Sequence, residues 1–152
     1  MDPKKLSKLD WWIVGAAAAL VIDLAALPWI DVSIGPVSYT SAGTGSPDGF
    51  LGLLALLAAL GVAVDLLLAR FMPSMRIAAL ERFGRTKSRL FGAAAALLLL
   101  VLKLVLHLHP SYLGVGCWIA LALAAVLTVF SYRSLNAPAA GGAPAPSGMV
   151  NG

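Results

Sequence analysis

The amino-acid sequence predicts an all-α integral membrane protein: a four-helix bundle with both termini in the cytoplasm and a short outer loop whose pattern suggests a small β-hairpin. Three observations predict this fold, namely an apolar composition, four apolar stretches of membrane-spanning length, and basic residues gathered on one side of those stretches. Hydrophobic residues make up 60% of the chain and charged residues only 12%, whereas an ordinary soluble domain is roughly half apolar and about a quarter charged. Such a composition indicates that lipid is the solvent.

The four apolar stretches define the predicted helices. A helix needs about 20 mostly apolar residues to cross a hydrocarbon core about 30 Å thick, because its backbone polar groups must bond within the segment. The stretches that meet this length are residues 11–30, 50–69, 90–109 and 113–131. They place residues 1–135 in one domain and leave residues 136–152, rich in Ala, Pro and Gly, as a disordered tail. No soluble catalytic domain of ordinary size fits beside them.

The first stretch is expected to be a retained helix and not a cleaved signal peptide. It follows the basic segment "KKLSKLD", which suits either interpretation. A signal-peptide core has about 7 to 15 apolar residues and ends at a small-residue cleavage site. This stretch is longer and ends at "LPW".

Basic residues fix the predicted orientation. All of the 11 lysines and arginines except Lys103 lie before the first stretch, between the second and third, or after the fourth. The positive-inside rule therefore places both termini and the middle loop in the cytoplasm. A short interfacial helix is expected in that loop, and its headgroup contacts are predicted to be Arg76, Arg82, Arg85, Lys87 and Arg89. The lipid bilayer thus accounts for the net charge of +4 without a nucleic-acid partner.

The outer loop carries strand and turn signals. Its segment "IDVSIGPVSYT" alternates apolar and polar residues on both sides of Gly35 and Pro36, which predicts a small hairpin or two paired extended segments. A two-stranded unit alone is marginally stable, so we expect it to rest on the helix ends or on a partner. Asp48 or Ser46 is expected to cap the start of the second helix.

Two charges lie inside the predicted helices at matched depth. Counted from the cytoplasmic side, Asp23 is roughly 18 Å along the first helix and Lys103 roughly 20 Å along the third. An unpaired charge near the bilayer centre costs at least about 2.5 to 3.5 kcal/mol. We therefore predict an intramembrane ion pair between Asp23 and Lys103 that acts as a structural clip, with a proton relay as the alternative role. The alternatives are that Lys103 snorkels to the outer headgroups, or that the ions face a watery cavity or a partner subunit.

The remaining polar side chains predict neither a metal site nor catalysis. His107 and His109, two residues apart, point to nearly opposite faces of a helix. Asp65 is about one turn from the cytoplasmic boundary, within reach of water or of basic groups. Cys117, the single cysteine, is expected to be a small packing residue. Since no nucleophile–base set, CxxC, HExxH or phosphate loop occurs in the sequence, we expect no enzymatic activity, no metal and no cofactor.

Small residues at i,i+4 spacing predict close helix packing, because they let backbones approach where lipid gives no hydrophobic drive. The longest such ladder is in the fourth stretch and consists of Gly116, Ala120, Ala124 and Thr128. A ladder of this kind packs either inside the bundle or at the seam of a homo-oligomer.

Three short features carry a resemblance to a known group of proteins. They are the "LPW" that closes the first stretch, the outer loop that ends in "DG" where the second stretch begins, and the basic middle loop. Over about its first 70 residues the chain resembles uncharacterised four-helix membrane proteins of high-GC Gram-positive bacteria. The resemblance implies this topology in a bacterial plasma membrane and implies no catalytic or binding residue.

Two classes of function remain. The first is a structural, accessory or assembly role in a membrane complex, with protein partner subunits or copies of the chain itself as partners. The alternative is a small proton-coupled transporter or channel that acts as an oligomer through Asp23, similar to small multidrug transporters with one acid in the first helix. A basic partner beside Asp23 argues against the alternative, because a paired acid is less free to exchange a proton for a cation. A lipid-modifying enzyme should show clustered polar residues at one interface, and the sequence shows no such cluster.

Overall fold

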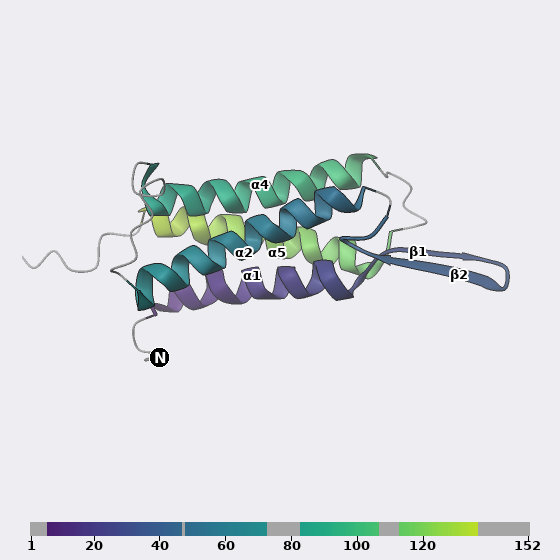
Figure 1. Ribbon diagram of the computed structural model, residues 1–152, viewed down its shortest axis with the longest axis horizontal. Coiled ribbons are helices and arrows are strands. Elements are labelled where there is room, and N and C mark those ends of the chain that lie inside the picture. Colours follow the sequence, from purple (N-terminus) through teal and green to yellow (C-terminus); the bar gives the residue numbers. More distant parts are fainter. Residues whose placement is uncertain (1–5, 47, 73–82, 107–112, 137–152) are drawn as a thin grey trace, which may run out of the picture.

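The computed structural model describes residues 6–46, 48–72, 83–106 and 113–136. Their elements, in chain order, are α1 (Lys8–Ala26), β1 (Pro28–Ile34), β2 (Val37–Ala42), α2 (Gly49–Phe71), α4 (Arg85–Leu106) and α5 (Val115–Asn136). The four helices form one bundle, and the two strands project from one end of it (Figure 1). We call this the hairpin end, and we call the opposite end, where α1 begins and α5 ends, the termini end.

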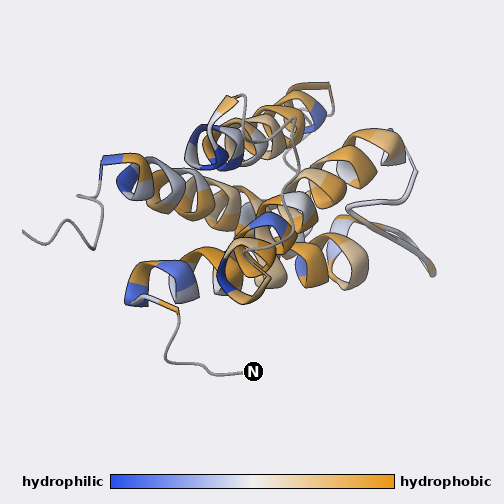
Figure 2. Cartoon of the chain, turned by 60° about the vertical axis from the view of Figure 1, so that its left-hand side comes forward, coloured by the Kyte–Doolittle hydropathy of each residue, from blue (hydrophilic) through white to orange (hydrophobic). Residues whose placement is uncertain are grey.

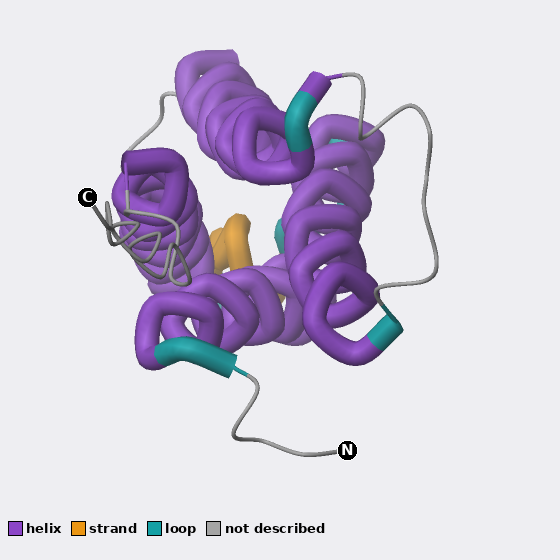
Figure 3. The backbone as a smooth tube through the Cα atoms, turned by 90° about the vertical axis from the view of Figure 1, so that its left-hand side faces the viewer, coloured by secondary structure: helices purple, strands orange, loops and turns teal. Residues whose placement is uncertain are grey.

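The helices surround a common axis. α1 packs against α2 and α5, and α4 packs against the same two helices. Figure 3, viewed from the termini end, shows this ring of four. As a result, α1 and α4 lie diagonally across the bundle and face each other only through its interior.

The interior of the bundle is built mainly from small side chains with leucines between them. The buried small residues are Ala16, Ala17, Ala55, Ala59, Ala63, Ala93, Ala96, Ala120 and Ala124. The fully buried leucines are Leu20, Leu24, Leu66, Leu100 and Leu127. Alanine rows allow the four backbones to approach closely, which is how helices pack when lipid covers their outer faces.

Large apolar side chains cover the outside of the bundle instead. Among the exposed ones are Ile22, Leu53, Leu57, Leu98, Val105 and Val129, and apolar residues extend over most of each helix (Figure 2). Soluble monomers rarely expose apolar patches of more than a few hundred Å². All four helices are long and apolar enough to cross a membrane by length and composition.

The helix ends are fixed by local chemistry. At the start of α1, the Ser7 hydroxyl accepts from the backbone N–H of Asp10 at 3.1 Å, and the Asp10 carboxylate accepts from the backbone N–H of Ser7 at 3.0 Å. This reciprocal arrangement is a capping box. At the start of α2, Asp48 occupies the cap position that the sequence predicts, but its backbone is left-handed and its side chain makes no capping bond.

The predicted hairpin is confirmed. β1 and β2 pair antiparallel from Ile34 opposite Val37 down to Pro28 opposite Ala42. Gly35 and Pro36 make the two-residue turn, and the φ of +61° at Gly35 matches a turn with glycine in its first central position. The root of the hairpin is also tied to the start of α5, since the backbone N–H of Gly114 donates to the carbonyl of Trp29 at 2.8 Å.

The four predicted helices are present, with shifted boundaries. The first helix was expected to reach residue 30, but α1 ends at Ala26 and Pro28 begins β1. The cause is Pro28, because the residue before a proline is driven out of the helical region, and Leu27 is extended. α4 begins earlier than predicted, at Arg85, and α5 continues to Asn136, the first residue assigned to the tail. The rest of that tail, most of the expected interfacial helix, and both histidines lie outside the described residues.

Candidate functional site

Four buried polar or polarisable side chains gather at the hairpin end. Asp23 is in the last turn of α1 and Lys103 in the last turn of α4, and their exposed fractions are 1% and 2%. Trp29 of β1 and Cys117 near the start of α5 are buried beside them. We call these four residues the polar cluster. It is a candidate site because ionisable groups inside an apolar bundle are costly and are usually functional.

Lys103 holds the loop between β2 and α2. Its ammonium donates to the backbone carbonyl of Gly43 and lies 3.4 Å from that of Gly45. It also sits 5.3 Å from the centroid of the Trp29 ring, in cation–π range, and interacts with the charge of Asp48. A charged donor on carbonyl oxygens makes a stronger hydrogen bond than a neutral one, so Lys103 anchors this loop to α4.

Glycines let the loop enter the end of the bundle. A Cβ on Gly43 would lie 2.7 Å from Leu24 Cδ2 and 3.0 Å from the Trp29 ring. Gly52 of α2 approaches the carbonyl of Gly43 so closely that a side chain there would collide with it. The loop is further held by the backbone N–H of Thr44, which donates to the carbonyl of Leu24 at 3.1 Å. The carbonyls that Lys103 binds are therefore placed by close backbone packing.

In the part of the chain that the structure describes, the Asp23 carboxylate lacks the hydrogen bonds that would normally stabilise a buried charge. Neither of its carboxylate oxygens has a hydrogen-bond partner among the described residues, and the same holds for Nε1 of Trp29. The indole N–H is close enough to act on the carboxylate but lies outside ordinary hydrogen-bond geometry. Asp23 also stands at the C-terminal end of its helix, where the helix dipole disfavours a negative charge. The local structure of α1 therefore does not stabilise a carboxylate at position 23.

The structure places Asp23 and Lys103 at the same end of the bundle but does not join them in a hydrogen-bonded ion pair. Both are in the last turn of their helices, which agrees with the matched depth predicted from the sequence. The carboxylate oxygens of Asp23 have no partner in the described part of the chain, because α1 and α4 are diagonal and Lys103 is directed to the carbonyls of the inserted loop. Cys117 interacts electrostatically with both charges, so the two still share one environment.

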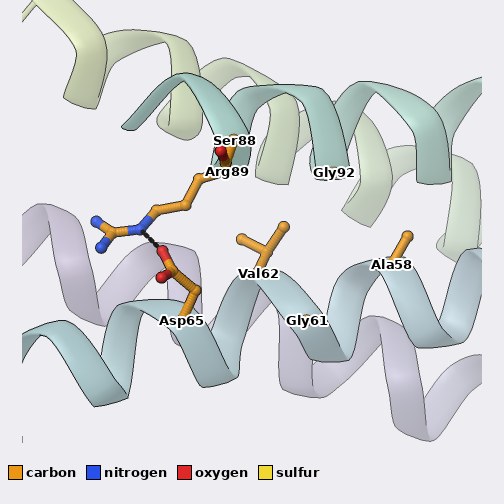
Figure 4. Close-up of a pocket in the computed structure, with 7 residues that line it drawn as sticks. All are labelled: Ala58, Gly61, Val62, Asp65, Ser88, Arg89 and Gly92. Atoms are coloured by element: carbon orange, nitrogen blue, oxygen red, sulfur yellow. Dashed lines mark hydrogen bonds and ion pairs between the residues drawn. The ribbon is translucent and has the colours of Figure 1, made fainter. Parts of the chain in front are cut away.

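A second set of charges lies at the termini end. Arg89 Nε donates to Asp65 Oδ2 at 2.6 Å, and the two side chains are only 10% and 11% exposed (Figure 4). Arg70 pairs with Asp10 at 2.8 Å, but its side chain is 45% exposed. Asp65 thus reaches a basic group, as expected. Arg89, which the sequence predicts to be a headgroup contact, also has its Nε turned inward to a carboxylate on the neighbouring helix, and the headgroup contact stays a prediction.

The other predicted headgroup contacts divide into two groups. Lys87 is exposed and Arg85 partly exposed at the start of α4, while Arg76 and Arg82 lie outside the described residues.

The predicted packing ladder lies within the chain. Gly116, Ala120 and Ala124 are buried, and Thr128, partly buried, donates from Oγ1 to the carbonyl of Ala124 at 2.8 Å. A Cβ on Gly116 would lie 2.9 Å from the carbonyl oxygen of Pro28, so this glycine permits the close approach of α5 to the root of the hairpin. The ladder consequently faces α1 and α4 and leaves no seam for a second copy along that face.

Among the residues that the structure describes, no three His, Cys, Asp or Glu side chains are grouped to hold a metal ion. The chain finds no match among protein families, curated proteins or solved structures. Sequence reasoning missed Trp29 and the loop glycines as members of the site. The only signals were the tryptophan after Pro28 and the unusual density of glycine in "SAGTGSPDG".

Proposed function

We propose that the chain is a multi-pass plasma-membrane protein with both termini in the cytoplasm, and that it serves as a structural or accessory subunit whose hairpin docks a protein partner on the outer side. One observation carries the proposal. The hairpin extends past the helix ends (Figure 1). On its apolar face, Val37 and Tyr39 are 68% and 53% exposed.

Membrane embedding is supported by the surface of the bundle. Four helices of spanning length carry their large apolar side chains outward. Exposed Trp11, Trp12 and Tyr132 lie near the termini end, and exposed Trp118 lies near the hairpin end. Tryptophan and tyrosine gather at both membrane–water interfaces, so these side chains suit two aromatic belts. The basic residues favour the cytoplasm for the termini end.

The two faces of the hairpin differ in polarity. Residues directly opposite each other in an antiparallel pair share a face, and faces alternate along a strand. The pairing of Val32 with Tyr39 puts Ile30 and Val37 on the same side, while Asp31, Ser33, Ser38 and Thr40 fall on the other side. Only the second face, with its polar side chains, is suited to contact with water. A two-stranded unit of this kind is marginal alone, and exposed aromatic and β-branched side chains in one row suit a protein interface.

The interior of the bundle favours a structural role over conduction. Between the polar cluster and the termini end, the helices face each other through buried alanines and leucines. Lys103 is committed to holding the loop that leads out of the hairpin. The apolar side chains do not line a polar path between the described helices. The Lys103 bonds keep the hairpin at a fixed position on the bundle.

The test uses the tagged full chain, extracted in mild detergent from cells that naturally make it. A partner should co-purify in constant stoichiometry and should be lost from a Val37→Ser/Tyr39→Ser variant. Ser38→Ala/Thr40→Ala is the matched control on the opposite face and should keep the partner. If both double variants recover the same proteins as the wild type, the hairpin is not the docking surface.

A second candidate, a proton-coupled transporter, is favoured by one specific observation. Asp23 is a buried carboxylate whose oxygens have no hydrogen-bond partner in the described part of the chain, and such a group is able to take up a proton. Purified protein in liposomes would then move protons or cationic dyes, and Asp23→Asn would abolish the flux. The accessory role predicts no flux from either protein.

A further inference from the structure

A groove of about 320 Å³ lies between α2 and α4, on the side of the bundle toward the termini end. Two glycines form it. A Cβ built on Gly61 would meet nothing within 4 Å, while one on Gly92 would lie 2.8 Å from Val62 Cγ2. Gly92 therefore sets the close approach of the two helices, and Gly61 leaves the groove open.

The polar end of the groove is Arg89. Its Nε is bonded to Asp65, which uses one of the five N–H groups of the guanidinium. The four N–H groups on the two terminal nitrogens have no partner within the described residues. Figure 4 shows these nitrogens turned away from Asp65, toward the helix ends. The side chain as a whole is nine-tenths buried, but the terminal nitrogens are not among the enclosed polar atoms, so an acceptor in the groove can reach them.

The charge around Arg89 calls for an anion. α4 begins with three basic residues in its first five, Arg85, Lys87 and Arg89, and its first turn has no acidic residue. The N-terminus of a helix already carries positive partial charge, so basic side chains there are unfavourable unless an anion lies nearby. Asp65 pairs with Arg89 through the arginine Nε alone. Guanidinium groups bind phosphate with two parallel hydrogen bonds.

We propose that this groove binds one anionic phospholipid. Its phosphate lies on the terminal nitrogens of Arg89 beside the Ser88 hydroxyl, and one acyl chain lies over Gly61, Val62 and Gly92. Gly61 is one helical turn from Asp65, about 6 Å farther from the termini end, so the groove passes from charge to apolar surface in the direction that a lipid does. The leaflet follows from the topology proposed above and is the cytoplasmic one.

The experiment measures lipid retained by the purified full chain. The protein is equilibrated in detergent micelles with equal amounts of phosphatidylglycerol and phosphatidylcholine of identical chains, and bound lipid is counted by native mass spectrometry. The wild type should retain phosphatidylglycerol with about a tenfold preference, because both lipids carry the phosphate but only the choline headgroup adds a positive charge beside the basic start of α4. Gly61→Leu fills the groove and should abolish the retention. Gly15→Leu is the matched control, because Gly15 of α1 also has nothing within 4 Å of a built Cβ and should leave retention unchanged.

Four results would overturn the proposal. The first is equal retention of the two lipids by the wild type, and the second is unchanged retention in Gly61→Leu. The third is displacement of the lipid by glycerol 3-phosphate at equal concentration, which would reduce the groove to a site for a free phosphate. If Gly61→Leu instead halves the mass of an oligomer, the groove is an interface between copies and the lipid site is refuted. Because the measurement is made in detergent, a wrong membrane orientation would not change its outcome, and the two proposals fail separately.

Discussion

The ammonium of Lys103 is bonded to the backbone carbonyl of Gly43, 60 residues away in the sequence. This bond joins the end of α4 to the loop that connects β2 with α2, so one side chain fixes the way in which the hairpin leaves the bundle. The buried lysine is thereby explained without a bond to Asp23. The first two predictions separate this arrangement from an Asp23–Lys103 pair.

Replacing Lys103 by methionine keeps the volume of the side chain and removes its charge and its donors. Two loop carbonyls then lose a buried charged donor, which should cost about 1.5 to 3 kcal/mol. We expect a lower unfolding midpoint in detergent and faster protease cleavage between β2 and α2, since local unfolding exposes the loop. Lys87→Met, at an exposed position of the same helix, should change neither. Unchanged cleavage in Lys103→Met would show that the loop does not depend on the lysine.

Replacing Asp23 by asparagine should leave stability unchanged or raise it. The carboxylate oxygens have no hydrogen-bond partner among the residues described, and burying an unpaired charge is unfavourable. A direct pair with Lys103 predicts the opposite, a loss of about 3 to 5 kcal/mol, because removing one partner leaves the other charge buried alone. Thermal unfolding of Asp23→Asn beside wild type decides between the two. In the double variant with Lys103→Met, the departure from additivity should stay at the low end of the range of about 0.5 to 3 kcal/mol that is typical of residues with a shared partner, because both side chains act on Trp29.

The Asp65–Arg89 pair should show strong coupling. Both side chains are about nine-tenths buried, so Asp65→Asn or Arg89→Gln alone should cost about 3 to 5 kcal/mol, and the double variant less than the sum of the two. The Arg70–Asp10 pair is the internal comparison. Its arginine is 45% exposed, so a coupling of about 1 kcal/mol or less is expected there. A double-mutant cycle in detergent measures both. Equal coupling in the two pairs would contradict the expectation that the more buried pair is the more strongly coupled.

Two glycines of α2 should respond to alanine in opposite directions. At Gly52, a methyl group would collide with the carbonyl of Gly43, whereas at Gly61 it would enter open space. Gly52→Ala should therefore displace the loop and lower the unfolding midpoint. Gly61→Ala should raise the midpoint slightly, because alanine is favoured over glycine in a helix by about 1 kcal/mol. A midpoint in Gly52→Ala at or above that of Gly61→Ala would mean that the loop is not seated against α2.

The sequence predicted the fold well because helix length and strand alternation are local signals. The four helices and the hairpin were recognisable from apolar stretches of about 20 residues and from the alternation around Gly35 and Pro36. The error at the end of α1 has a simple source. Trp29 and Ile30 continue the apolar run, but Pro28 diverts the chain into a strand, and apolar content alone does not distinguish the two.

The partners of the buried charges were harder to predict, because they depend on backbone placement. Counting residues along helices gave the matched depth of Asp23 and Lys103. It could not show that α1 and α4 are diagonal, nor that the carbonyls of Gly43 and Gly45 enter the space between them. Arg89 is similar: its position near the cytoplasmic boundary suggested lipid, while its bond to Asp65 depends on the contact between α2 and α4.

Substituted-cysteine labelling in intact cells tests most directly whether the four helices cross a membrane with the hairpin on one side and the termini end on the other. Two variants are made in a Cys117→Ala background, Thr40→Cys on the hairpin and Lys87→Cys at the start of α4. Cells that make either variant are treated with a membrane-impermeant maleimide. The proposed topology predicts rapid labelling at position 40 in intact cells and labelling at position 87 only after the membrane is permeabilised. Labelling of both positions in intact cells, or of position 87 alone, would contradict it.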